Sequence, residues 1–187
     1  MYKYLLEQLQ LSPQQIIVAG DSAGAGLAMA TMLRLRDAKQ SELLPVAAIL
    51  SCPYVDLETP GDERKVPYCI LADKPGQAIM EVYHPREGHP STWGDASPVH
   101  CDLSGLPPVY IQAAELDYIL PHAKRLLQKA KTDGAEDWEM EIFPNVPHVF
   151  TNFPPFILPS AAKGLDAMAE YAAAKFTTAR DPPQVQE

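Results

Sequence analysis

Residues 15–26 read QIIVAGDSAGAG, and this stretch decides the fold. The apolar run Ile16–Ala19 is short and continuous, as in a strand that is covered on both faces. It leads into Gly20, and residues 23–38 are rich in alanine, methionine, leucine and arginine, which favour a helix. The stretch therefore predicts a sharp turn from a buried strand into a helix, with the hydroxyl of Ser22 at the bend.

Further apolar segments alternate with helical patterns along the chain. Strands are predicted at Val46–Leu50, Val109–Ala114 and Trp138–Phe143, and helices at residues 2–9, 75–83, 122–132 and 160–176. Strands that alternate with helices indicate parallel pairing with right-handed crossovers. We expect one α/β domain over residues 1–187 with a mostly parallel sheet, and a disordered tail at 177–187.

Residues 53–108 interrupt this alternation, because they are dense in proline, glycine and charged side chains. The segment is too long for a plain connection between two strands. In compact domains such stretches are usually functional and form lids or binding loops. We therefore expect it to be an insertion with a role at the functional site.

The composition excludes several classes of partner. The net charge of −9 argues against nucleic acid and anionic membrane surfaces, because both repel an acidic protein. The three cysteines form no C-x-x-C pair. We expect them to be small buried residues with free thiols, in a protein of a reducing compartment. We find no signal-peptide core, no apolar run long enough to span a bilayer and no metal-ligand spacing. We expect a soluble cytoplasmic protein without a metal or cofactor.

The bend itself has the pattern G-x-S-x-G, from Gly20 to Gly24. A strand that turns sharply into a helix strains the backbone of its apex residue and needs small neighbours two positions away. The apex hydroxyl projects where ligands bind in open α/β sheets, and the Ala23 amide at the helix start can donate to an oxyanion. A phosphate loop would need a lysine here, and a dinucleotide site would need glycine or alanine at Met29. A tight turn without chemistry is the remaining alternative.

A nucleophilic serine needs a base and an orienting acid, in the chain order Ser, Asp or Glu, His. Of the five histidines, only His148 follows the last predicted strand. Asp117 follows the third strand, and Glu115, two residues earlier, is the competing acid. Because the carboxyl ends of parallel strands share one edge of the sheet, we predict a triad of Ser22, His148 and Asp117.

Several phrases of the sequence now resemble one known family. They are GDSAG at 20–24, ASPVHCDLSGLPPVYIQ at 96–112, AELD at 114–117 and PHVF at 147–150. Together they resemble the hormone-sensitive lipase-like branch of the α/β-hydrolases, whose members are serine carboxylesterases and lipases. The resemblance implies a small-molecule ester substrate, with Ser22 as nucleophile, Asp117 as acid and His148 as base. It also implies that residues 53–108 hold the second half of a cap.

The sequence departs from the family pattern at three places. Ala25 stands at the usual final glycine of the elbow, and Leu120-Pro121-His122 replaces a stretch that is usually richer in aspartate. No H-G-G-G motif, which supplies further oxyanion donors, occurs in the chain. The loss of one such donor typically costs about 10²–10³-fold in rate.

By the family plan, we expect an N-terminally truncated domain that lacks the first four strands and the first cap segment. Ala23 would then be the remaining oxyanion donor. The strand at Ile16–Ala19 would be an open edge, which predicts aggregation or oligomerisation through it. Two alternatives stay open: an inactive hydrolase remnant that binds a ligand or partner, and an unrelated doubly wound binding module. Amidase or peptidase chemistry would use the same triad.

Overall fold

The computed structural model describes residues 1–59, 61–71, 82–84, 88–89 and 92–180. Its sheet has the strands β1 (Ile17–Asp21), β2 (Ala47–Ser51), β3 (Val109–Ala114) and β4 (Trp138–Phe143). They lie side by side in chain order, and every neighbouring pair is parallel. The predicted α/β fold with a parallel sheet is therefore confirmed.

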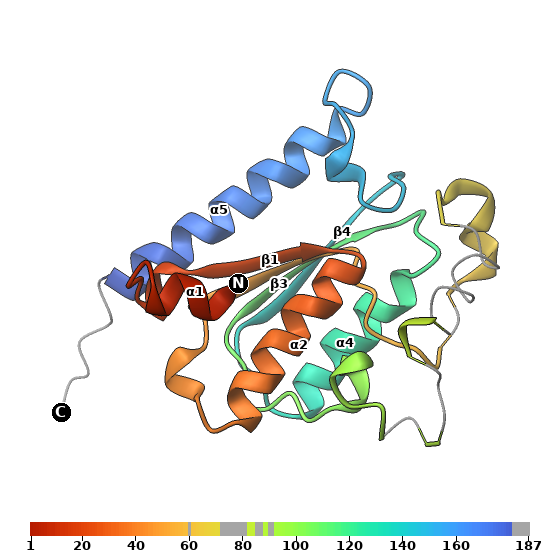
Figure 1. Ribbon diagram of the computed structural model, residues 1–187. Coiled ribbons are helices and arrows are strands. Elements are labelled where there is room, and N and C mark those ends of the chain that lie inside the picture. Colours follow the sequence, from red (N-terminus) through yellow and green to blue (C-terminus); the bar gives the residue numbers. More distant parts are fainter. Residues whose placement is uncertain (60, 72–81, 85–87, 90–91, 181–187) are drawn as a thin grey trace.

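The helices form a layer on each side of this sheet. They are α1 (Tyr2–Glu7), α2 (Ala23–Asp37), α4 (Leu120–Thr132) and α5 (Ser160–Arg180). Figure 1 shows α2 and α4 together on one face of the sheet and α5 across the other. The sheet is thus the middle layer of three, as expected when strands alternate with helices along the chain.

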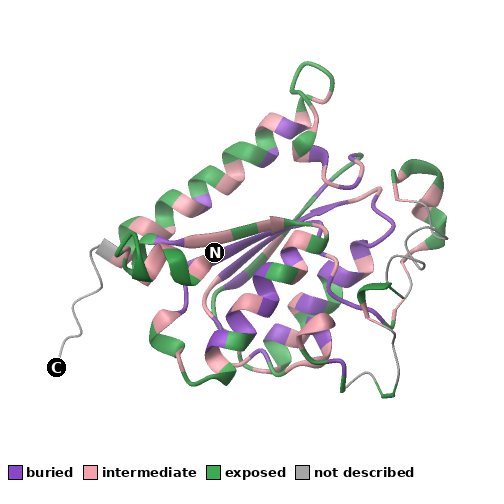
Figure 2. Ribbon diagram, viewed as in Figure 1, coloured by how far each residue is buried: buried purple, intermediate pink, exposed green. Residues whose placement is uncertain are grey.

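The core divides between the two faces of the sheet. Met29 of α2 and Leu126 of α4 pack with Leu50 and Ile111 of the central strands, and all four side chains are completely buried. On the other face, Tyr171 of α5 stacks on Tyr110 of β3 with ring centroids 5.3 Å apart. Figure 2 shows the same division, with buried positions on the strands and on the helix faces turned toward them.

The strands differ in burial according to their place in the sheet. Every residue of β2 and β3 is buried, whereas β1 is partly exposed because it has a neighbour on one side only. Ile17 and Val18 pack against the core on opposite faces of the sheet, but Ala19 is exposed, so the predicted coverage of β1 on both faces is only partial. The prediction that β1 forms an edge is confirmed. Pairing with another chain through this edge stays a prediction.

The predicted bounds need small corrections. β1 runs on to Asp21, because its backbone continues to pair with Ser51 of β2. Helix α4 begins two residues earlier than predicted, and α5 continues to Arg180. Residues 177–180 of the predicted disordered tail are therefore helical, and 181–187 lie outside the described residues.

Between β2 and β3, the described residues form short 3₁₀ helices. They are η3 (Glu63–Tyr68), η5 (Gly94–Ala96) and η6 (Pro98–His100). The helix predicted at 75–83 lies outside the described residues, apart from 82–83, which are helical. The interpretation of residues 53–108 as part of a cap stays a prediction. Among the described helices, none has the length and apolar character needed to cross a membrane.

Candidate active site

The four parallel strands end at one edge of the sheet, and the candidate residues follow these ends. Ser22 comes directly after β1, and Asp117 follows β3 by three residues. His148 follows β4 by five residues. The register aligns the last residues of β1 and β2 with each other, and likewise those of β3 and β4. The fold therefore gathers side chains that lie as much as 126 positions apart, from 22 to 148, at one edge.

The turn at Ser22 is strained, as the motif predicts. Its backbone has φ 53° and ψ −120°, a conformation that residues with a side chain rarely adopt. A Cβ atom added to Gly20 would collide with the backbone of Gly24 and Ala25. Glycine at position 20 therefore permits the close approach of β1 to the first turn of α2.

The other glycines of the motif do not all have the predicted role. A Cβ at Gly24 would meet no atom within 4 Å outside its own helix, so the expected steric need for a small residue is wrong there. At Gly26 a Cβ would lie 2.7 Å from the carbonyl oxygen of Tyr54. The tight contacts of the elbow are thus at Gly20 and Gly26, and the second of these joins α2 to the loop after β2.

Asp117 and His148 form a buried acid–base pair. The Nδ1 atom of His148 lies 2.8 Å from Oδ2 of Asp117, and both side chains are almost completely buried. With the carboxylate ionised, Nδ1 carries the proton and donates it to this hydrogen bond. The Nε2 atom then has a free lone pair and can accept a proton from a hydroxyl.

The competing acid, Glu115, has a different position. Its Oε2 atom accepts a hydrogen bond of 2.9 Å from the backbone N–H of Asn145, in the loop after β4. That loop leads to His148. Of the two carboxylates, Asp117 is therefore the partner of His148, and Glu115 fastens the loop that carries it.

The loop after β4 carries His148, the candidate base, and is called the base loop. It is held by apolar packing and contains a second strained residue. Phe150 is fully buried, lies 4.8 Å from Phe143 between ring centroids, and packs against α5 where Gly164 leaves room for its ring. Val149 has φ 46° and ψ 41°, which is rare for a β-branched residue. Its N–H points to the sulfur of Cys52 at 3.4 Å. The packing of Phe150 and the contact with Cys52 thus hold the strained backbone directly after His148.

The backbone of Ser22 is hydrogen-bonded to the segment at the end of β2, which also contacts the base loop. Its N–H donates to the carbonyl of Ser51, and its own carbonyl accepts from the N–H of Tyr54. Cys52, next to Ser51, contacts the base loop through its sulfur. Among the described residues, no hydrogen bond joins Ser22 Oγ to His148. Such bonds are often long in enzymes without substrate, and they tighten when it binds.

Two of the cysteines, which the sequence predicts to be small buried thiols, lie beside the acid–base pair. Ligand atoms of Cys52, Asp117 and His148 all lie within 4.8 Å of one another. Burial, with a further contribution from Asp117, raises the pKa of Cys52 to about 12. Because His148 Nδ1 pairs with Asp117, we interpret this group as an acid–base pair beside a thiol. Cys69 also contacts Asp117, at 3.5 Å.

Sequence could have placed Cys52 at the site, because it directly follows β2 at the edge where the other candidates gather. It could not have placed Cys69 or Phe150. The path of the irregular segment brings Cys69 near, and a packing contact with α5 fixes Phe150.

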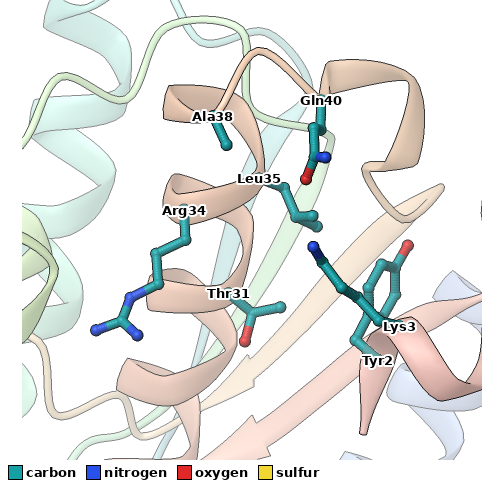
Figure 3. Close-up of a pocket in the computed structure, with 7 residues that line it drawn as sticks. All are labelled: Tyr2, Lys3, Thr31, Arg34, Leu35, Ala38 and Gln40. Carbon is teal, nitrogen blue, oxygen red and sulfur yellow. The ribbon is translucent and has the colours of Figure 1, made fainter.

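A hollow of about 320 Å³ lies between α1 and α2, away from this site. Figure 3 shows Tyr2 and Lys3 of α1 across from Thr31 and Leu35 of α2 and from Gln40, which follows that helix. A second hollow, of about 440 Å³, is bordered by Asp62, Lys124 and Glu115 among others. Neither of the two is lined by Ser22 or His148.

Comparison with known proteins agrees with the fold. Residues 1–152 match a family model described as the alpha/beta hydrolase fold. An acetyl-hydrolase of Streptomyces hygroscopicus is 34% identical over 177 residues, and an esterase of Acinetobacter venetianus is 33% identical over 180. These matches cover 91% and 92% of this chain, and 56% of each relative.

Solved structures give the same result. An esterase from the bacterial hormone-sensitive lipase (HSL) family superposes with a TM-score of 0.84 at 29% identity. A mutant of the esterase E40 gives 0.83 at 28%. Each match covers 94% of this chain and 58% of the other. The chain thus spans a little over half the length of the relatives it matches. The predicted resemblance is confirmed: this chain belongs to the alpha/beta hydrolase fold family, in the branch of the hormone-sensitive lipase-like esterases.

Proposed function

We propose that this chain carries the catalytic residues of a serine ester hydrolase, with Ser22 as nucleophile, His148 as base and Asp117 as the orienting acid. The observation that carries the proposal is the buried hydrogen bond of 2.8 Å between His148 and Asp117. It lies at the sheet edge where Ser22 occupies a strained turn. A buried carboxylate bonded to Nδ1 leaves Nε2 basic, which is what a serine hydroxyl requires.

The reaction has two steps. In the first, Ser22 Oγ bonds to the ester carbonyl carbon while its proton passes to Nε2 of His148, and the carbonyl oxygen becomes an oxyanion. The carbon–oxygen bond to the alcohol then breaks, and the alcohol leaves with the proton from His148. In the second step water attacks the acyl-serine in the same way, which releases the carboxylic acid and restores Ser22.

The oxyanion would be stabilised at the start of α2. Ala23 is the first residue of that helix, so its N–H has no acceptor within the helix. The positive end of the helix dipole acts at the same place. Asp117 stabilises the imidazolium that forms when His148 takes the proton, because the two groups are already paired and shielded from water.

The relatives support an ester of a short acid as substrate. One similar protein is named an acetyl-hydrolase and others are named esterases. We extend this to the present chain as a proposal, with the acetyl group as the smallest acyl group expected. Residues 53–108, which follow β2 at the catalytic edge, would help to enclose it as part of a cap.

The alternative is an inactive hydrolase remnant that binds a ligand but does not hydrolyse it. Two observations favour it: β1, which Ser22 directly follows, is a partly exposed edge, and Ser22 Oγ makes no hydrogen bond to His148 among the described residues. In that case the site could still bind an ester or a carboxylate without hydrolysing it.

Hydrolysis of p-nitrophenyl acetate and butyrate by the purified chain separates the two. The esterase proposal predicts turnover that is lost in Ser22→Ala and retained in Ser41→Ala, a matched change in the 3₁₀ helix η2 (Ser41–Leu43). Turnover by folded Ser22→Ala at the wild-type rate would contradict the proposal. A folded wild-type chain without turnover would favour the remnant.

A further inference from the structure

The carboxylate of Asp117 is held from both of its oxygens. Oδ2 accepts from His148, at 2.8 Å. Oδ1 accepts from the backbone N–H of Ile119 at 3.0 Å and from the thiol of Cys69 at 3.5 Å. The Ile119 contact is local to the loop at residues 115–119 that carries Asp117, called the acid loop below. The Cys69 contact comes from 48 residues away and is the long-range bond to Oδ1.

Cys69 belongs to a segment that is fastened to the acid loop at several other points. The N–H of Asp62 donates to the carbonyl of Tyr118 at 2.6 Å. Gly61 lies so close to Tyr118 that an added Cβ would meet the ring at 2.5 Å. Cys69 directly follows the 3₁₀ helix η3, which Figure 1 shows in yellow beyond the carboxyl ends of the strands. The approach of the thiol to Asp117 is thus one part of an extended contact.

The Cys69 thiol is suited to donate rather than to repel. Burial raises its pKa, and the charge of Asp117 raises it further, while the backbone amides of Tyr118 and Leu71 oppose the shift. At neutral pH the sulfur therefore keeps its proton. A thiolate in this place would put a second negative charge beside the carboxylate and would disturb its bond to His148.

We propose that Cys69 is a positioning residue: its S–H group donates to Asp117 Oδ1 and fixes the carboxylate in the orientation that pairs with His148. This inference rests on the proposed function of the Asp117–His148 pair. It makes the segment after β2 part of the acid–base apparatus, and not only a cover for substrate. It also predicts that thiol chemistry at position 69 acts on the base through the acid.

A purely structural role for Cys69 predicts something different. A half-buried cysteine that only fills space would tolerate alanine, with a change in stability and none in the acid–base pair. The distinction can be measured directly, because the proton between His148 Nδ1 and Asp117 Oδ2 gives its own far-downfield proton resonance. This resonance reports on the hydrogen bond whether or not the chain turns over substrate.

The experiment compares the wild-type chain with Cys69→Ala, Cys69→Ser and the matched control Cys101→Ala. Cys101 is also free and half-buried, but its charged neighbours are Asp95, Asp37 and Arg36 rather than the acid–base pair. We expect the downfield resonance to move in Cys69→Ala, because the carboxylate loses a donor and binds His148 differently. It should return toward the wild-type position in Cys69→Ser, which restores a donor, and stay unchanged in Cys101→Ala.

Steady-state kinetics provide the second readout. Loss of one such hydrogen bond should lower kcat for p-nitrophenyl acetate about three- to tenfold, with KM little changed and partial rescue by serine. A folded Cys69→Ala with the wild-type resonance and kcat would overturn the role of Cys69 and leave the proposed function standing. Absence of the resonance from the wild type would contradict the Asp117–His148 pair, and with it both proposals.

Discussion

The proposed nucleophile, Ser22, and the proposed acid–base pair, Asp117 and His148, are held in place in different ways. Ser22 directly follows the edge strand β1, and its backbone hydrogen bonds to Ser51 and Tyr54 and the close approach of Gly20 to Gly24 fix its position. Asp117 and His148 are buried, and contacts from several distant segments surround them. One half of the candidate site is therefore held by backbone contacts, and the other by contacts between side chains.

This difference teaches where each half is vulnerable. The elbow is held by backbone contacts, which are the close approach of Gly20 to Gly24 and the hydrogen bonds of Ser22 to Ser51 and Tyr54. The acid–base pair depends on partners 31 residues apart, with supporting contacts that span 48 and 97 residues. Changes at the elbow should act on backbone strain, and changes at the pair should act on orientation and charge.

The largest effect should come from the acid–base side. Asp117→Asn keeps the shape of the side chain but changes which His148 nitrogen carries the proton, so hydrolysis should fall about 10⁴-fold. Glu115→Gln is the matched control, because this carboxylate bonds to Asn145 rather than to His148. Initial rates with p-nitrophenyl acetate measure both. Equal losses in the two variants would contradict the assignment of Asp117 over Glu115.

The next largest effect should be structural and lie at the elbow. Gly20→Ala places a Cβ against the backbone of Gly24 and should destabilise the chain by about 3 kcal/mol or more. Gly24→Ala meets open space and, as a glycine-to-alanine change inside a helix, should stabilise it by up to about 1 kcal/mol. Urea unfolding followed by circular dichroism compares the pair. If the two changes had the same sign, the steric account of this turn would be wrong.

A smaller effect should relieve the strain at the nucleophile itself. Ser22→Gly removes the side chain from a residue at φ 53° and should stabilise the fold by about 1 kcal/mol while it abolishes hydrolysis. Ser22→Ala keeps a Cβ and should gain nothing of that kind. The comparison again needs only urea unfolding. A Ser22→Gly variant less stable than Ser22→Ala would show that the turn is not strained.

The smallest effect concerns the pH dependence of stability, and it comes from His122 in α4. Burial lowers the pKa of His122, although Asp56 and Asp117 favour its charged form and Arg125 opposes it. Because the unfolded chain takes up a proton near pH 6.5 and the folded chain resists it, stability is complete above that pH. It is lost as the pH falls from 6.5 toward the lowered folded value.

A His122→Gln variant tests this, since an amide can still donate to the carbonyl of Thr59 without titrating. Melting temperatures between pH 7 and pH 5 should fall less steeply in the variant than in the wild type. An unchanged pH dependence in the variant would show that protonation of His122 does not limit the stability of the fold at low pH.

Sequence predicted the four strands, the edge position of β1 and the contact of Asp117 with His148, whereas the roles of these residues and of Ser22 as a triad stay a prediction. The confirmed predictions depend on local periodicity and on the rule that parallel strands end together. Sequence was only partly right on the burial of β1 and was wrong on the role of Gly24. Both depend on which atoms approach from elsewhere, as does the position of Cys69, and spacing along the chain carries little information about such contacts.

The measurement that tests the central claim most directly is labelling with a fluorophosphonate, followed by mass spectrometry of the proteolysed chain. The reagent bonds to a serine oxygen with loss of fluoride, and it needs an activated hydroxyl rather than a good substrate pocket. We predict one adduct, on the peptide that contains Ser22, lost in Ser22→Ala and strongly reduced in His148→Gln. A folded wild-type chain without an adduct, or with its adduct on another serine, would contradict the claim.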